Sequence, residues 1–242
     1  MALIFNEQFE STGTPGYDET ATGVGSDWTE IVDDGCIEDE KYLTSNVTNA
    51  PASWGSQCLR SYVDVVSEEA HSYNTLDANQ PVVYVRADFI AETGLTDAWE
   101  NTEWLRICDE SWNLLFVVLI GGIGTARHIH FNPRYDDSDH WQDGGAFDLN
   151  TPYRVDVKWD TTANTWEWKI NGVTKHSGTG LTSTREPRII NVGVYTAYVT
   201  GIELFTDNVQ IATDGWIPAD GGVVSPRRLP FSISSLGRGW RN

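Results

Sequence analysis

The chain has 242 residues, of which 40% are hydrophobic and 11 are tryptophan, so it is neither wholly disordered nor a coiled coil. Its 35 acidic residues outnumber the 16 basic ones and give a formal charge of −19 at pH 7. A surface this acidic repels polyanions, which argues against nucleic acid or an anionic membrane as a partner of the main body.

The predicted elements are strands, because apolar and polar residues alternate with a period of two along most of the chain. In chain order they are predicted at residues 83–89, 114–120, 127–132, 153–159, 166–170, 189–195 and 202–211. The run at 114–120 is apolar on both faces, which predicts a central strand covered on both sides. No long helix is predicted, and turn residues recur at short intervals, as they do in β-sandwiches.

The composition changes at the C-terminal end of the chain. Residues 221–242 contain four arginines and no acidic residue, a net charge of +4, which leaves −23 for the other 220 residues. We therefore predict one folded domain, residues 1–220, followed by a basic extended arm, residues 221–242. The arm is expected to dock on an acidic neighbouring subunit, since guanidinium groups pair with carboxylates and aromatic side chains anchor interfaces. The residues expected to make this contact are Arg227, Arg228, Phe231, Arg238, Trp240 and Arg241. A solubilising disordered end and a nucleic-acid-binding tail are the alternatives.

The cysteines and the apolar runs bear on the compartment. Cys36, Cys58 and Cys108 are too few for a disulfide framework. Buried thiols are expected, with a Cys36–Cys58 bridge as the alternative. The opening segment, residues 1–5, lacks the positive region of a signal peptide, and the apolar run at 114–123 is too short to cross a membrane. We expect a protein made in the cytoplasm that inserts into no membrane.

Several stretches, taken in order, resemble the strands of one superfamily. They are residues 3–9, 54–60, 83–89, the hairpin 153–172 that ends in Asn171-Gly172, and residues 205–211 with Asp207-Asn208-Val209. Together they resemble the concanavalin A-like lectin/glucanase superfamily, in its laminin-G-like form. The resemblance covers residues 3–217 and implies an all-β, antiparallel jelly-roll sandwich whose closing strand pairs beside the first. This superfamily includes lectins, glycanases, lyases and structural modules, so the fold does not decide the function.

The catalytic patterns of that superfamily are incomplete here. Its hydrolases resemble one another in a Glu-x-Asp-x-Glu strand, whereas Glu103 and Asp109-Glu110 have the wrong spacing. Its lyases need a Tyr or His base and a group that neutralises the uronate carboxyl. Residues 188–195 look similar to one lyase strand, but Asn191 occupies its Lys position, and the companion Arg-rich and Gln-x-His strands are not found. We therefore predict no catalytic residues and interpret residues 188–195 as a structural strand.

One strand and its loop form a polar, aromatic-rich region. This region is predicted to stack on sugar rings through Trp104, Trp112, His128, His130, Tyr135 and Trp141. A plain surface or a subunit interface is the alternative. His128 and His130 could also ligate a metal with a third ligand from residues 135–141. The carboxylates of Asp136, Asp137 and Asp139 are a candidate calcium site, against the simpler interpretation of a solvated turn.

These observations favour a virion protein. A lectin-like domain without a secretion signal or a catalytic set, followed by a docking arm, suits a non-enzymatic phage subunit made in the host cytoplasm. We expect an oligomeric capsid decoration or tail-associated protein whose sandwich contacts host-surface glycan. The first alternative is a polysaccharide lyase or glycanase of the same superfamily. The second is a free carbohydrate-binding module.

Overall fold

The computed structural model describes residues 3–7, 9, 30–33, 37–67, 69–93, 101–123, 126–198 and 200–218. The predicted docking arm and Cys36 lie outside these residues, so the arm and the Cys36–Cys58 bridge stay predictions. Cys58 and Cys108 are both buried. Within the described part of the chain, no helix is long and apolar enough to cross a membrane.

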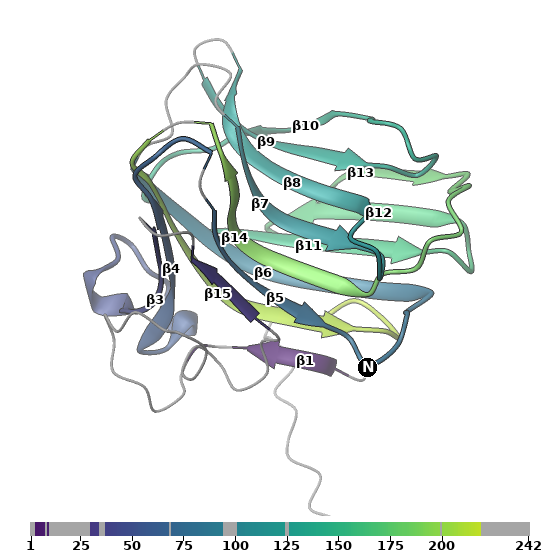
Figure 1. The fold of residues 1–242 in the computed structure, drawn as a ribbon, viewed down its shortest axis with the longest axis horizontal. Coiled ribbons are helices and arrows are strands. Elements are labelled where there is room, and N and C mark those ends of the chain that lie inside the picture. The colour runs from purple at the N-terminus through teal and green to yellow at the C-terminus, as the bar shows by residue number, and fades with distance from the viewer. Residues whose placement is uncertain are drawn as a thin grey trace, which may run out of the picture.

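The described strands form two antiparallel sheets that pack face to face (Figure 1). The eight-stranded sheet runs in the order β13 (Val173–Thr179), β12 (Thr165–Ile170), β11 (Tyr153–Asp160), β6 (Val82–Thr93), β15 (Ile202–Ala212), β4 (Gln57–Val63) and β3 (Ile37–Leu43), with β1 (Leu3–Glu7) paired to β15. The seven-stranded sheet runs in the order β10 (Gln142–Ala146), β9 (Ala126–Pro133), β8 (Leu114–Ile123), β7 (Asn101–Cys108), β14 (Ile189–Ala197), β5 (Ala70–Thr75) and β2 (Glu30–Asp33). Two short 3-10 helices, Thr44–Asn46 and Ala52–Trp54, precede β4.

This architecture confirms the predicted all-β jelly-roll sandwich. The closing strand β15 pairs beside the first strand β1, with Phe5 opposite Ile211, as the resemblance implied. Figure 1 shows these strands, purple and yellow, side by side although they lie at opposite ends of the sequence. A sheet that joins distant segments in this way depends on long-range pairing, which local sequence patterns alone do not encode.

The core lies between the sheets and follows the period-two pattern. Alternate residues of β11, including Val155, Val157 and Trp159, are fully buried against the other sheet. The central strand β8 is covered on both faces as predicted, since Phe116 packs in the core while Val117, its outward neighbour, is also fully buried. On the outer face of the seven-stranded sheet, side chains of the central strand are therefore shielded from solvent as well.

Candidate functional site

A row of polar side chains crosses the outer face of the seven-stranded sheet. Strand pairing places Arg106 of β7 opposite Asn191 of β14, and Asn191 opposite Tyr73 of β5. On the other side of Arg106 the row continues through Val117 of β8 to Asn132 of β9. Directly paired residues of neighbouring strands share one face of a sheet, so these side chains lie together.

A β-bulge in β7 sets the position of the charged groups. Glu103 pairs with Leu119 while Leu105 pairs with Val118, which leaves Trp104 as an extra residue. The bulge turns Trp104 into the core, where it is fully buried and its Nε1 donates to Thr206 Oγ1 at 2.9 Å. The prediction that Trp104 stacks on sugar is therefore wrong. The same bulge brings Glu103 onto the outer face, with its Oε2 3.2 Å from Arg106 Nε.

Arg106 is the unusual group of this face. It is 9% exposed, and the ring centroid of Tyr195 lies 3.5 Å from its guanidinium carbon. Despite the nearby Glu103 carboxylate, Nε and Nη1 of Arg106 are buried and make no hydrogen bond within the described residues. Buried donors without acceptors are rare because each costs roughly 1–3 kcal/mol or more. Glu103 pairs with this guanidinium by charge, but its carboxylate does not satisfy these two donors.

A histidine and an amide lie beside this guanidinium. Asn191 Nδ2 donates to His71 Nδ1 at 2.6 Å, and His71 Nε2 lies 3.1 Å from Glu69 Oε2. Burial, reinforced by the charge of Arg106, lowers the pKa of His71 to about 3. His71 is therefore neutral at physiological pH and carries its proton on Nε2, toward Glu69. Asn191 Oδ1 is buried and accepts no hydrogen bond from the described residues.

A second irregularity, in β14, places the tyrosine. The register of β14 against β7 shifts between Val192 and Thr196, and Gly193 in this stretch has a φ of 113°. A Cβ on Gly193 would lie 2.5 Å from the Ala70 carbonyl oxygen, so only glycine lets β14 approach β5 this closely. Tyr195 then rests on Arg106 and on the His71 ring, whose centroid is 4.8 Å from its own.

The loop after β9 adds negative charge to the edge of this site. Burial raises the pKa of Glu103; Arg106 opposes this effect, and Asp139 of the loop adds to it. Asp139 Oδ1 accepts a hydrogen bond from Asn132 Nδ2 at 2.8 Å. Glu103 is thus more easily protonated than an exposed glutamate, and its protonation would leave Arg106 without a competing carboxylate.

The predicted calcium ligands are engaged with different partners. Asp136 Oδ1 lies 2.7 Å from His140 Nε2, Asp137 Oδ1 lies 3.3 Å from Arg185 Nη1, and Asp139 bonds Asn132. Within the described residues, no three His, Cys, Asp or Glu side chains are grouped to hold a metal, the His128–His130 pair included. Metal binding therefore stays a prediction without structural support.

The remaining predicted glycan contacts are spread over the outer face. His128 and His130 lie on it, with ring centroids 5.9 Å apart, and His130 is in one row with Leu119 and Glu103. Trp112 is 39% exposed and packs edge-on against Tyr73 of β5, whereas Trp141 is 54% exposed and directly precedes β10. Exposed indoles thus lie near opposite sides of this sheet. Tyr135 is half-buried and stacks on His140, so it is largely withdrawn from the face.

Sequence reasoning missed the central residues, Arg106 and His71, and took the strand of Asn191 and Tyr195 as structural. The similarity of residues 188–195 to a lyase strand was the available signal for the latter pair. Arg106 had no such signal, because Glu103 and Arg106 share a face only through the bulge at Trp104. Their spacing of three does not fit strand alternation.

The comparisons with known proteins concern the fold. No known family and no curated protein matches the sequence. Among solved structures, the chain is similar to the globular domain of T. cruzi calreticulin, with a TM-score of 0.56, 10% identity, and coverage of 88% of this chain and 89% of that one. It is also similar to a sialidase, with a TM-score of 0.54, 11% identity, and 78% of this chain matched to only 17% of that one. An alginate lyase from Pseudomonas aeruginosa matches with a TM-score of 0.49, 11% identity, and coverage of 60% and 73%. The matches to the calreticulin domain and the sialidase show the fold, a jelly-roll β-sandwich.

Proposed function

We propose that the chain binds an acidic polysaccharide on the outer face of the seven-stranded sheet. The observation that carries this proposal is the buried guanidinium of Arg106, whose Nε and Nη1 make no hydrogen bond within the described residues. Guanidinium groups make strong, charge-assisted hydrogen bonds to carboxylates, so a uronate carboxylate suits Arg106. The acceptor Asn191 Oδ1 lies beside it and suits a neighbouring sugar hydroxyl.

The shape of the face favours a polymer over a small acid. From β5 to β10 the sheet has six neighbouring strands, about 24 Å across at a spacing of about 4.8 Å. Polar side chains follow this direction, and exposed Trp112 and Trp141 lie near its two sides. Indole rings stack on the apolar faces of sugars, which gives a chain of several residues contacts on either side of the Arg106 subsite.

Binding can be tested through Arg106. Because truncating Arg106 alone leaves Glu103 buried without its partner, the comparison is Glu103→Gln against the double variant Glu103→Gln/Arg106→Met. Hydrogen bonds to charged groups contribute about 1.5–3 kcal/mol, so the double variant should bind polygalacturonate or polymannuronate at least about tenfold more weakly than Glu103→Gln. Titration calorimetry measures this, and equal affinities would refute the proposal.

Cleavage by β-elimination is the second candidate, and the position of Tyr195 favours it. Arg106 neutralises the uronate carboxylate, which makes the C5 proton more acidic. Tyr195 Oη takes that proton while its own phenolic proton passes to the leaving glycosidic oxygen; the C5–H electron pair forms the C4–C5 double bond as the C4–O bond breaks. His71 has both ring nitrogens engaged, so it positions Asn191 rather than moving a proton.

Tyr195→Phe separates cleavage from binding. If the chain is a lyase, wild type releases products with the ultraviolet absorbance of an unsaturated uronate, while the variant keeps its affinity and loses this activity. If wild type releases none from any polyuronate, the chain is a binding domain only.

We further propose that the chain acts in a virion, as a capsid decoration or tail-associated subunit. It is supported by the charge difference between the basic arm, residues 221–242, and the acidic remainder, and no described residue bears on it. The test is the solution mass of the full chain against residues 1–220, at low and high salt. Large, salt-sensitive assemblies that form only with the arm would support it, and two monomers would contradict it.

A further inference from the structure

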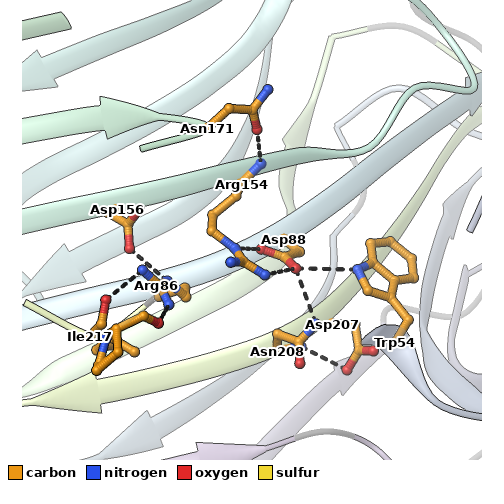
Figure 2. A network of polar contacts seen from close by, with 10 residues as sticks. Trp54, Arg86, Asp88, Arg154, Asp156, Asn171, Asp207, Asn208 and Ile217 are labelled. Carbon is orange, nitrogen blue, oxygen red and sulfur yellow. Dashed lines mark hydrogen bonds and ion pairs between the residues drawn. The ribbon is translucent and has the colours of Figure 1, made fainter. Parts of the chain in front are cut away.

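A pocket of about 350 Å³ lies on the opposite side of the molecule, on the outer face of the eight-stranded sheet. Its walls include Ser53 of the second 3-10 helix, Pro51 directly before that helix, Pro152 before β11, and Asn171 in the β12–β13 turn. Its floor is made by Arg and Asp side chains of β6 and β11, which Figure 2 shows from close by. The volume falls within the range of small-molecule sites, about 300–1,000 Å³.

The floor is held rigid by a network of ion pairs. Arg154 donates two hydrogen bonds to Asp88, from Nε to Oδ1 at 2.8 Å and from Nη2 to Oδ2 at 3.0 Å. Asp88 Oδ2 also accepts from Trp54 Nε1 and Asn208 Nδ2 (Figure 2). Asp88 is thereby fully engaged and holds the floor in place, so the recognition of a ligand falls to other groups.

Asp156 is the group left open. It is 2% exposed, and its Oδ1 accepts from Arg86 Nε at 2.7 Å. Both terminal nitrogens of Arg86 donate elsewhere, to the carbonyl oxygens of Ile217 and Pro218. No described residue donates to Asp156 Oδ2, although this carboxylate lines the pocket. A buried carboxylate with one open oxygen favours a ligand that donates a hydrogen bond.

The pocket also offers donors and apolar walls. Asn171 Oδ1 accepts from the Arg154 backbone N–H at 2.9 Å, so its Nδ2 points away from that strand (Figure 2). The exposed Ser53 adds a hydroxyl, and Pro51 and Pro152 add apolar surface. Two paired arginines and two aspartates leave the floor without net charge, which disfavours an anion. One deep acceptor, peripheral donors and apolar walls together match a polyhydroxylated ring.

We propose that this pocket binds a neutral pyranose sugar, with a ring hydroxyl donating to Asp156 Oδ2. The site lies on the opposite sheet from Arg106, so it is separate from the proposed acidic-polysaccharide site. Two sugar sites on opposite faces make the domain bivalent, which allows it to link glycans or to gain avidity on a mixed one.

The probes are methyl α-mannopyranoside, methyl β-glucopyranoside and methyl β-galactopyranoside. Ligand-observed NMR measures the binding of each one to the full chain. We expect at least one to bind with a Kd of about 1 mM. Ser53→Trp fills the pocket from an exposed position and should weaken binding at least about tenfold, whereas Ser45→Trp, exposed on the other 3-10 helix, should not change it. Asp156→Asn keeps an acceptor for Arg86 and should cause a similar loss.

Two controls keep the outcome decisive. Asn171→Asp removes the Nδ2 donor but keeps the turn and the oxygen that accepts from the Arg154 backbone N–H. It should weaken glycoside binding, so it tests the pocket even if Asp156→Asn fails to fold. Glu103→Gln/Arg106→Met should leave methyl glycoside binding unchanged even if it abolishes polyuronate binding. The proposal is overturned if no methyl glycoside binds, if Ser53→Trp binds as well as wild type, or if the Arg106 double variant loses the binding.

Discussion

His71 shows how one side chain links the proposed site to stability. Its imidazole is buried, accepts from Asn191, and lies near the charge of Arg106, so the folded protein holds it neutral with a pKa of about 3. In the unfolded chain the same imidazole titrates with its ordinary pKa of 6.5. Between these values the unfolded state binds a proton that the folded state does not, so the free energy of unfolding must fall as pH falls below 6.5.

The size of this pH effect on stability follows from the difference between the folded and unfolded pKa values of His71. At two pH units below the unfolded pKa, His71 should lower the free energy of unfolding by about 2–3 kcal/mol. His71→Gln does not titrate, so its stability should decline less steeply between pH 6.5 and 4.5, as urea denaturation at each pH would show. Parallel curves for wild type and variant would mean that His71 is protonated in the folded protein.

At the same scale, the sequence indicated some groups of the site but not others. Asn191 and Tyr195 lie in a strand whose similarity to a lyase strand is visible, so their neighbourhood could be predicted. His71 follows no motif, and its role depends on β5 pairing with β14 more than a hundred residues later. Among the described residues, Arg106 stands out because its buried Nε and Nη1 make no hydrogen bond, which is a property of the folded surroundings and not of the sequence.

At the scale of the element, alternation predicted the sandwich but did not predict β7, the strand that holds Trp104. A period of two identifies strands and buried faces, and the apolar run in β8 correctly indicated a strand covered on both faces. A bulge changes which face each later residue occupies, and the local composition of β7 does not predict the bulge at Trp104. Trp104, which was expected to stack on sugar, lies in the core, where its indole Nε1 donates to Thr206.

The irregular stretch of β14 predicts a strong effect of a small substitution. Gly193→Ala places a methyl group 2.5 Å from a backbone oxygen of β5 at a φ of 113°, where an L residue is strained. We expect a loss of about 2 kcal/mol or more in the free energy of unfolding, with weaker polyuronate binding because Tyr195 shifts. Gly215→Ala is the matched control, since its Cβ meets no atom within 4 Å. Equal stability of both variants in thermal unfolding would show that β14 adjusts without cost.

At the scale of the whole molecule, the charge and the proposed ligand oppose each other. A protein of net charge −19 repels a polyuronate over long distances, while the buried Arg106 attracts a single carboxylate at close range. Salt acts differently on the two, because it screens separated exposed charges strongly and a buried contact weakly. The acidic body then limits how fast the polymer arrives, and the Arg106 subsite decides how long it stays.

This balance predicts an unusual salt response. Raising sodium chloride from about 10 mM to about 150 mM shortens the screening length from about 30 Å to about 8 Å, so it should remove most of the long-range repulsion. Polyuronate affinity should therefore rise over this range, mainly through a faster association rate, as surface plasmon resonance would measure. A neutral polysaccharide should show no such change. If polyuronate affinity instead falls steadily with salt, binding rests on exposed basic residues such as those of the arm, and the Arg106 subsite is not the main contact.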